Sequence, residues 1–572
     1  MRSSLNILSR LLPLTYAVVL FTPTTASADS RKISKDLKDH NSNAEVDVIV
    51  QFNADVTDRH ADKVKTLGGT ERGRFSVVRS GLYRVAAKQL EQLTDDPEVA
   101  FVSPNRKLKG VIEYSSPAVN APIAWNYGWT GKYVGVAVID SGVSDHPDLL
   151  DSFCIGNRIV YEENFVSTER STNDGYGHGT HVAGILGGNG KCASAATATR
   201  SFKGIAPDAK IISLRALDSQ GQGTDAAVIA AINRAILLKS VFNIRVINLS
   251  LGRPVYESHK TDPLTLAVKK AWQSGIVVVA AAGNEGRYDA NGQDGYGTIS
   301  SPGNSPYVIT VGAVRTMESA GRSDDVIATY SSKGPTAVDH VVKPDLVAPG
   351  NRVVSLMAPL SALSGFTETQ IQRSYYLPGY FGQSTYYMRL SGTSMATAVV
   401  SGAAALMLQK EPSLTPDIVK ARMMKTATKA FPYMTTATDR STGALYTAYH
   451  DLFTIGAGYL DVFAALNNSE TSTGLAMSPS AVWDRTKNST MIVYDSNVVW
   501  ADATRWGGKI IYGSNVVWSD NVVWADGVLW GQNVVWADSR STAFNVVWSD
   551  NVVWADNVVW ADSLKLSLSG EK

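Results

Sequence analysis

The 572-residue sequence predicts an α/β fold whose largest part is a doubly wound, mostly parallel sheet, accompanied by a small α+β domain and a β-type repeat tail. Three observations lead to this prediction. Between residues 125 and 468, apolar stretches with few charges alternate with helical patterns, as buried parallel strands and their crossover helices do. A short run of strands and helices precedes this region, and a six-residue motif repeats after it. Several domains are expected at this length.

Residues 1–28 are predicted to be a secretory signal peptide. Arg2 and Arg10 supply its charged region, the apolar core at 11–21 is too short to span a bilayer, and a small-residue cleavage motif precedes Asp29. No cysteine follows the core to carry a lipid, and no later stretch has transmembrane character. The net charge of +1 gives no argument for binding nucleic acid or an anionic membrane. We therefore expect a secreted, extracellular protein, with attachment to the cell surface left open.

Residues 29–113 come next and contain a compact α+β unit at about 45–109. Period-two alternation predicts its strands, and glycines end the first of its helices. The unit is too small and simple to look catalytic, and a linker at 110–122 follows it. Its expected strands and helices occupy, in chain order, 46–52, 61–69, 81–87, 89–96 and 99–106.

The main domain is predicted to span residues 114–470. Sites in doubly wound sheets lie at the carboxyl ends of the strands, so candidate catalytic groups are sought there. The expected strands, with the clearest helix among them, are 134–140, 210–217, 224–240 (the helix), 246–251 and 276–283.

A buried helix predicted within LSGTSMATAVVSGAAALML, residues 390–408, begins with three hydroxyl side chains, Ser391, Thr393 and Ser394. An ordinary N-cap needs one hydroxyl and is the simpler explanation. The alternative is a nucleophile, because free N–H groups and the positive dipole end at a helix start favour developing negative charge. A serine nucleophile also needs a base and a group that orients the base.

Two segments offer these groups. His178 lies in DGYGHGTHVAGILGG, where a glycine-rich loop runs into an apolar helix, and His181 one turn later is expected to pack inside. Asp140 stands at the carboxyl end of a buried apolar strand, where a carboxylate needs a partner. Taken singly, a structural histidine and a capping aspartate remain the alternatives.

Together the three segments resemble the subtilisin-like serine protease family. The acid segment VIDSGV, the base segment HGTHVAG and the nucleophile segment GTSMA occur in the order Asp, His, Ser of that family. The resemblance implies Asp140 as orienting group, His178 as general base and then acid, and Ser394 as nucleophile. One departure is Ala398, where the family usually has proline; alanine suits a helix, so little effect on the chemistry is expected.

The resemblance extends to the groups that surround the reacting bond. It implies Asn284, in IVVVAAAGNEG, as the side-chain oxyanion donor beside the backbone N–H of Ser394, with a surface turn as the alternative. It also implies a roomy, mostly apolar first specificity pocket and an edge that pairs with an extended peptide. The pocket walls are Ser250, Leu251 and Gly252 opposite Ala282 and Gly283, and the edge is Gly221, Gln222 and Gly223.

Further expectations depend on the same resemblance, which covers roughly residues 125–465. It implies that residues 45–109 are an inhibitory propeptide, cut within 108–118 during maturation of a zymogen. No cofactor is expected for catalysis. Asp148, in HPDL, matches a calcium-ligand position in some members, and a solvated turn carboxylate explains it equally well, so structural calcium stays open and no metal site is assigned.

The two cysteines, Cys154 and Cys192, are close together in the sequence. In an oxidising compartment a disulfide is the simplest interpretation, and two buried free thiols are the alternative.

The predicted C-terminal extension, 471–572, contains twelve hexads between residues 491 and 562, typified by NVVWAD. Eleven carry Trp or Tyr at the fourth position, with Thr542 as the exception. In a helix these rings would point in three directions, whereas in strands a six-residue period puts them on one face. A single strand of this length would run about 240 Å, so the chain must turn often, and a solenoid or repeated hairpins are favoured.

Three functions follow from these observations. The leading one is a secreted serine endopeptidase of broad specificity, made as a zymogen, which acts on polypeptides and is inhibited by its own propeptide. The second is a binding protein built on an inactive protease fold, which the intact set of four catalytic groups argues against. The third is an active protease whose tail sets its location, through polysaccharide, cell envelope or protein assembly; for the tail, a plain spacer is the alternative.

Overall fold

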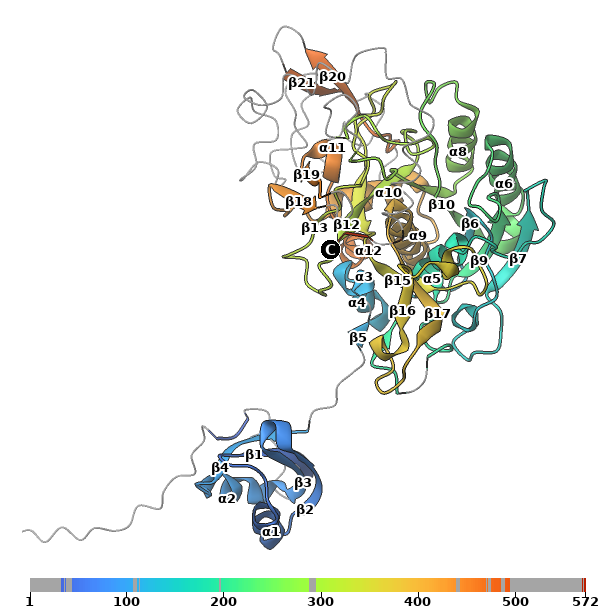
Figure 1. Cartoon of the computed structure of the whole chain (residues 1–572). Coiled ribbons are helices and arrows are strands. Elements are labelled where there is room, and N and C mark those ends of the chain that lie inside the picture. Colours follow the sequence, from blue (N-terminus) through green and yellow to red (C-terminus); the bar gives the residue numbers. More distant parts are fainter. Residues whose placement is uncertain are drawn as a thin grey trace, which may run out of the picture. The chain divides into compact units, whose positions relative to one another are not determined.

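The computed structural model describes residues 32–34, 37, 44–105, 111–112, 114–194, 197–287, 295–438, 443–469, 471, 475–484, 489–493, 568 and 570–571. The chain divides into two compact units, Met1–Lys109 and Gly110–Lys572 (Figure 1). The predicted signal peptide and the hexads from residue 494 onward lie outside the described residues.

The first unit is a four-stranded antiparallel sheet with two helices, in the order β-α-β-β-α-β along the chain. Alternation in β1 buries Val48, Val50 and Phe52 against the helices. The sequence did not indicate β2, because TERGRF has no alternating apolar residues and lies on the sheet edge. In the sheet order β2-β3-β1-β4 the elements are β1 (Glu45–Phe52), α1 (Asp58–Thr66), β2 (Thr70–Phe75), β3 (Ser80–Ala86), α2 (Leu90–Asp95) and β4 (Val99–Pro104).

The second unit is built on the predicted mostly parallel sheet, with strand order β13-β12-β11-β10-β6-β9-β7 and β14 beside β12. Among its described pairs only β12–β13 is antiparallel. The inner strands are charge-poor because both faces are covered, whereas the edge strand β7, with sequence IVYEEN, is only partly buried. They are β6 (Gly135–Asp140), β7 (Ile159–Asn164), β9 (Lys210–Arg215), β10 (Ile244–Leu249), β11 (Val277–Ala281), β12 (Ile309–Arg315), β13 (Val326–Ile327) and β14 (Leu346–Pro349).

Helices cover both faces of this sheet: α5 and α9 pack together over one face, and α6 and α8 over the other (Figure 1). Nearly every side chain of α9 is buried, which explains its almost uniformly apolar sequence. The helices of this unit are α3 (Ser115–Ala118), α4 (Ala121–Asn126), α5 (His178–Gly187), α6 (Asp225–Leu237), α7 (Lys239–Phe242), α8 (Pro263–Gln273), α9 (Thr393–Lys410), α10 (Pro416–Thr426), α11 (Leu452–Ile455) and α12 (Val462–Asn467).

Smaller sheets complete the unit. A three-stranded sheet, ordered β15-β17-β16, lies between the main sheet and α9 in the sequence. The remaining strands are β5 (Val111–Ile112) with β8 (Arg200–Ser201), β15 (Val353–Leu356), β16 (Gln370–Gln372), β17 (Gln383–Leu390), the hairpin β18 (Met434–Thr438) with β19 (Leu445–Tyr449), and the hairpin β20 (Ser480–Asp484) with β21 (Ser489–Val493).

The chain stays attached to this unit beyond the predicted domain boundary at residue 470. Ser480 forms a bridge with Val341, and the Ser478 hydroxyl bonds both Lys420 Nζ and a carboxylate oxygen of Asp345. Because Lys420 and Asp345 are buried charges, the Ser478 hydroxyl gives both of them a hydrogen-bond partner inside the core. Within the described part of the chain, no helix is both long and apolar enough to cross a membrane.

A disulfide joins Cys154 to Cys192, across a sequence separation of 38 residues. It ties the turn after residue 151 to the loop after α5. We expect the double variant Cys154→Ser/Cys192→Ser to unfold with a free energy lower by about 3–4 kcal/mol, because the open loop regains entropy in the unfolded chain. Guanidinium denaturation measures this, with the reduced native protein as control; equal stabilities of variant and native protein would contradict it.

Candidate active site

Asp140 and His178 meet where strand β6 ends and helix α5 begins. Asp140 is the last residue of β6 and is fully buried, and its Oδ1 accepts a hydrogen bond from Ser141 N at 2.8 Å. His178 is the first residue of α5, and its Nδ1 lies 2.7 Å from the same oxygen. This approach requires glycine at position 179, because a Cβ there would overlap the carbonyl oxygen of Gly142.

Burial and the neighbouring carboxylate change the pKa of His178 in opposite directions. Burial lowers the pKa of the imidazole, but the charge of Asp140 and the hydrogen bond to it raise the pKa above its ordinary value overall. His181, one turn later, is buried as predicted, and its Nε2 lies 3.2 Å from Val353 O. Burial, together with the charge of His178, lowers the pKa of His181 to about 3, so this ring is neutral and structural.

The three hydroxyl groups before helix α9 have different partners. Ser391 Oγ accepts from Arg352 N at 2.9 Å, and Thr393 Oγ1 accepts from Gly283 N at 3.1 Å. Ser394 Oγ donates to Ser250 O at 3.1 Å, while Ser250 Oγ donates to Ser394 O at 2.8 Å. None of them caps the helix by a side-chain hydrogen bond, since Gly392 occupies the N-cap position. The ordinary N-cap explanation is therefore wrong for this helix.

Ser394 and His178 are not hydrogen-bonded among the described contacts, because the serine hydroxyl is turned to Ser250. Catalytic hydrogen bonds are often absent or long until a substrate is in place. A rotation about the Cα–Cβ bond of Ser394 releases this hydroxyl without any change of the backbone.

Asn284 follows strand β11 and points toward the start of α9. Its Oδ1 accepts from Thr393 N at 2.9 Å, which leaves Nδ2 as the free donor side of the amide. A Cβ placed on Gly392 would lie 3.3 Å from that Nδ2 and 3.7 Å from Ser394 N. The two N–H donors therefore border the same small space beside Gly392, the arrangement that an oxyanion needs.

The predicted pocket walls come together at Ser300. A Cβ on Gly252 would lie 2.5 Å from Ser300 Oγ, and one on Gly283 would lie 3.3 Å from the same oxygen. Ser300 N also donates to Ala282 O at 2.9 Å. Gly252, after Ser250 and Leu251, and Gly283, after Ala282, therefore both border the small side chain of Ser300, and their role as pocket walls stays a prediction.

The predicted peptide-pairing edge lies in a tight turn. Asp218 N donates to Gln222 O at 2.7 Å, Gly221 has φ +76°, and Gly223 bridges back to Leu217. A Cβ on Gly221 would lie 2.6 Å from the ring of Tyr176, only two residues before His178. Glycine at 221 thus brings this edge next to the loop that carries the histidine.

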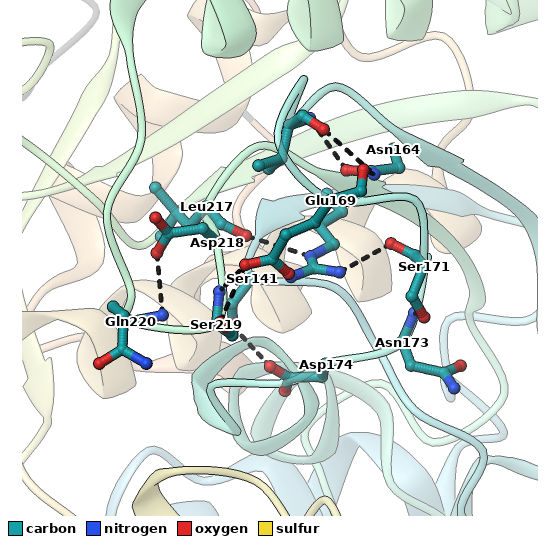
Figure 2. A network of polar contacts seen from close by, with 12 residues as sticks. Ser141, Asn164, Glu169, Ser171, Asn173, Asp174, Leu217, Asp218, Ser219 and Gln220 are labelled. Atoms are coloured by element: carbon teal, nitrogen blue, oxygen red, sulfur yellow. Dashed lines mark hydrogen bonds and ion pairs between the residues drawn. The ribbon is translucent and has the colours of Figure 1, made fainter.

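Sequence reasoning missed Asp174, which holds the His178 loop. This carboxylate is buried and accepts a hydrogen bond from Ser141 Oγ at 2.7 Å (Figure 2). It also accepts from Gly177 N at 2.6 Å and from Thr180 N at 2.7 Å. Burial raises the pKa of Asp174 more than these hydrogen bonds lower it. The acidic residue in the glycine-rich DGYG stretch just before His178 was the available signal.

Arg215 and Glu169 were also missed, and they join the loop after β7 to the peptide-pairing edge. Arg215 is 1% exposed; it donates to Ser171 O at 2.7 Å, to Leu217 O at 3.2 Å, and forms an ion pair with Glu169. Glu169 also accepts from the amide and hydroxyl of Ser219 (Figure 2). No local pattern indicates this network, since its members are up to 50 residues apart.

Asp148 does not fit a calcium ligand. Its Oδ1 accepts from the backbone N–H groups of Lys191 (3.1 Å) and Ala193 (2.8 Å), and its Oδ2 accepts from the hydroxyl of Tyr387 (2.6 Å). The described residues also include no group of three or more His, Cys, Asp or Glu side chains able to hold a metal ion. Structural calcium stays open, as the sequence left it.

Comparison with known proteins places this site in context. The sequence pattern of the Subtilase family matches residues 131–445. "Serine protease AprX" of Bacillus subtilis is 36% identical over 357 residues, which cover 61% of this chain and 74% of that protein. "Subtilisin E" of the same organism is 34% identical over 372 residues, 64% of this chain and 80% of that protein. "Thermostable alkaline protease" of Halalkalibacterium halodurans is 31% identical over 343 residues, with 60% and 75% coverage.

Proposed function

Since the chain belongs to the subtilase family and is a serine endopeptidase, we propose that Asp140, His178 and Ser394 are its catalytic triad. The observation that carries this assignment is the 2.7 Å contact between His178 Nδ1 and Asp140 Oδ1. It leaves Nε2 of the imidazole as the proton acceptor, and the buried carboxylate keeps the ring in that tautomer.

In the proposed mechanism, His178 Nε2 takes the proton of Ser394 Oγ as this oxygen bonds to the substrate carbonyl carbon. The carbonyl oxygen becomes an oxyanion, held by Asn284 Nδ2 and Ser394 N. His178 then gives its proton to the departing amine as the C–N bond breaks, which leaves an acyl-enzyme. Water then loses a proton to His178 as its oxygen bonds to the acyl carbon. The bond between that carbon and Ser394 Oγ breaks, and His178 returns the proton to Oγ.

Labelling with a fluorophosphonate probe tests the assignment, because such a probe reacts only with an activated serine. Peptide mapping of the labelled protein is expected to find one adduct, on Ser394. A folded, propeptide-free chain that forms no adduct would refute the assignment.

The role of Asn284 gives a matched pair of variants. Asn284→Asp keeps the oxygen that accepts from Thr393 N but loses the amide donor, whereas Asn284→Ala loses both. We expect both to lower kcat by about 10²–10³-fold, the range known for the oxyanion donor of subtilisin, with KM little changed. Steady-state kinetics with a peptide substrate measure this. A fall confined to Asn284→Ala would assign the side chain to helix capping instead.

We also propose a broad specificity with an apolar side chain before the cut bond. The small groups of Gly252, Gly283 and Ser300 along the two walls support a roomy pocket, and no cofactor is part of the proposal. Cleavage of a peptide library dominated by acidic residues at that position would contradict it.

We further propose that the protein is secreted as a zymogen, with the first unit as its inhibitory propeptide. Support comes from the compact fold of residues 45–104 and from the relatives, several of which are named subtilisins. N-terminal sequencing of active protein from the culture medium is expected to give a start within 108–118. A start at Asp29 on active enzyme would contradict this maturation.

For the tail, contact with polysaccharide or the cell envelope remains one proposal and a plain spacer the other. Retention of envelope or glycan material by the full chain, lost when the hexads are deleted, would favour contact.

A further inference from the structure

The last described residues of the chain are packed on the second unit. Leu568 is 7% exposed and Glu571 is 4% exposed. Glutamate is almost never buried to this extent without a charged partner. The chain thus contacts this unit both at strand β20 and again at Leu568 and Glu571, on either side of the hexads. We call residues 568–571 the returning segment.

The Glu571 carboxylate lies in a pocket of donors. Its Oε1 accepts from Arg287 Nη2 at 2.7 Å, from Thr329 N at 2.9 Å, and from the Thr329 hydroxyl; its Oε2 lies 3.4 Å from Arg315 Nη1. Arg287, Arg315 and Thr329 are called the carboxylate pocket. The side chains of both arginines are less than a tenth exposed. Two guanidinium groups at this depth require negative charge nearby, and Glu571 is the carboxylate that pairs with both.

The neighbouring Asn351 recognises the peptide backbone rather than a free anion. Glu571 N donates to Asn351 Oδ1, and Asn351 Nδ2 donates to Glu571 O, both at 2.8 Å. This two-way pairing uses one donor and one acceptor of a single residue, which an inorganic anion does not offer. The contact therefore selects a segment of polypeptide.

Gly570 is needed for the segment to fit. It has φ +66°, a conformation that favours glycine. A Cβ at this position would overlap Ser391 Oγ and lie 2.6 Å from Arg352 Cγ. The buried leucine, the glycine and the glutamate together define a sequence preference of Leu-x-Gly-Glu.

The carboxylate pocket and its surroundings also lie close in the sequence to the proposed catalytic groups. Arg287 stands three residues after Asn284, and Ser391, which borders Gly570, stands three residues before Ser394. The returning segment thus contacts the two loops that supply the proposed oxyanion donors, at positions outside the proposed machinery.

We propose that the carboxylate pocket and Asn351 form a binding site for an acidic peptide segment, and that its occupant is the returning segment of this same chain. The site fastens the far end of the hexad region to the second unit. A cut within the hexads then leaves the returning segment bound as a separate peptide until it dissociates.

Hydrogen exchange at the Thr329 amide tests this proposal. The measurement uses the full chain with its proteolytic activity inhibited. In Glu571→Gln and in Gly570→Val, the peptide spanning residues 326–331 is expected to exchange about tenfold faster or more, because release of the returning segment takes the acceptor away from Thr329 N. The first variant removes the charge and the second keeps it but blocks the fit. Glu368→Gln, at an exposed carboxylate, is the matched control and should exchange like the native chain.

A synthetic peptide of residues 566–572 supplies the second measurement. Added to a chain that lacks 568–572, it should restore slow exchange at 326–331, whereas the same peptide with Glu571→Gln should not. Equal exchange in all the chains, or equal rescue by both peptides, would overturn the proposal. Neither readout depends on proteolysis, so a failure here is separate from a failure of the proposed triad.

Discussion

Ser394→Ala is expected to lower kcat by about 10⁶-fold, the loss measured in subtilisin when its nucleophile is removed. The two other hydroxyl groups of the same turn are not expected to replace it, because Ser391 Oγ is bonded to Arg352 N and Thr393 Oγ1 to Gly283 N. Steady-state kinetics with a chromogenic peptide give kcat and KM, and KM should change little since the pocket walls are intact. Residual turnover comes from the oxyanion donors and substrate binding.

Ser391→Ala is the matched control for this variant. It removes a hydroxyl three residues away in the same turn, and we expect kcat to stay within about tenfold of the native value, because its loss affects one backbone contact. If kcat fell equally in Ser394→Ala and in Ser391→Ala, Ser394 would not be the nucleophile. If maturation is autocatalytic, Ser394→Ala should also accumulate with the first unit still attached.

Asp140→Asn is expected to lower kcat by about 10⁴-fold, because an amide at this position no longer holds the imidazole in the productive tautomer. The geometry should be preserved, since Asp140 is fully buried and asparagine has the same shape. The measurement is again kcat and kcat/KM, with a melting curve to check the fold.

The same variant should move the acidic limb of the pH profile. Activity needs neutral His178, so kcat/KM falls as pH drops through the pKa of the imidazole. In the native protein Asp140 raises that pKa against the effect of burial. Without the carboxylate, burial dominates and lowers the pKa, so the residual activity should persist to lower pH than native activity does. Asp145→Asn, at a nearby exposed residue, should leave the limb unchanged; an unmoved limb in Asp140→Asn would contradict the assignment.

The candidate site was predictable where it depends on local sequence. Asp140 ends a strand that its apolar neighbours specify, His178 begins a helix after a glycine-rich loop, and Asn284 follows another buried strand. In a parallel sheet the carboxyl ends of strands share one edge, so these positions converge once the fold class is known.

Other features were not predictable because their partners are distant in the sequence. In the sequence Arg215 has no visible partner, and only the fold brings Glu169 and Ser171 to it. The role of Asp174 also depends on its hydrogen bond with the Ser141 hydroxyl. Likewise β2 forms because a neighbouring strand pairs with it, although its own residues lack a strand pattern.

By itself the sequence determined the fold class, the positions of Asp140, His178, Asn284 and Ser394 at strand and helix ends, and the two cysteines, because periodicity and short motifs act over a few residues. Only the tertiary structure decided that Ser394 is turned to Ser250 and that Glu571 lies among buried arginines. Side-chain direction and charge pairing depend on atoms that long-range packing brings within a few ångströms, and no local pattern encodes them.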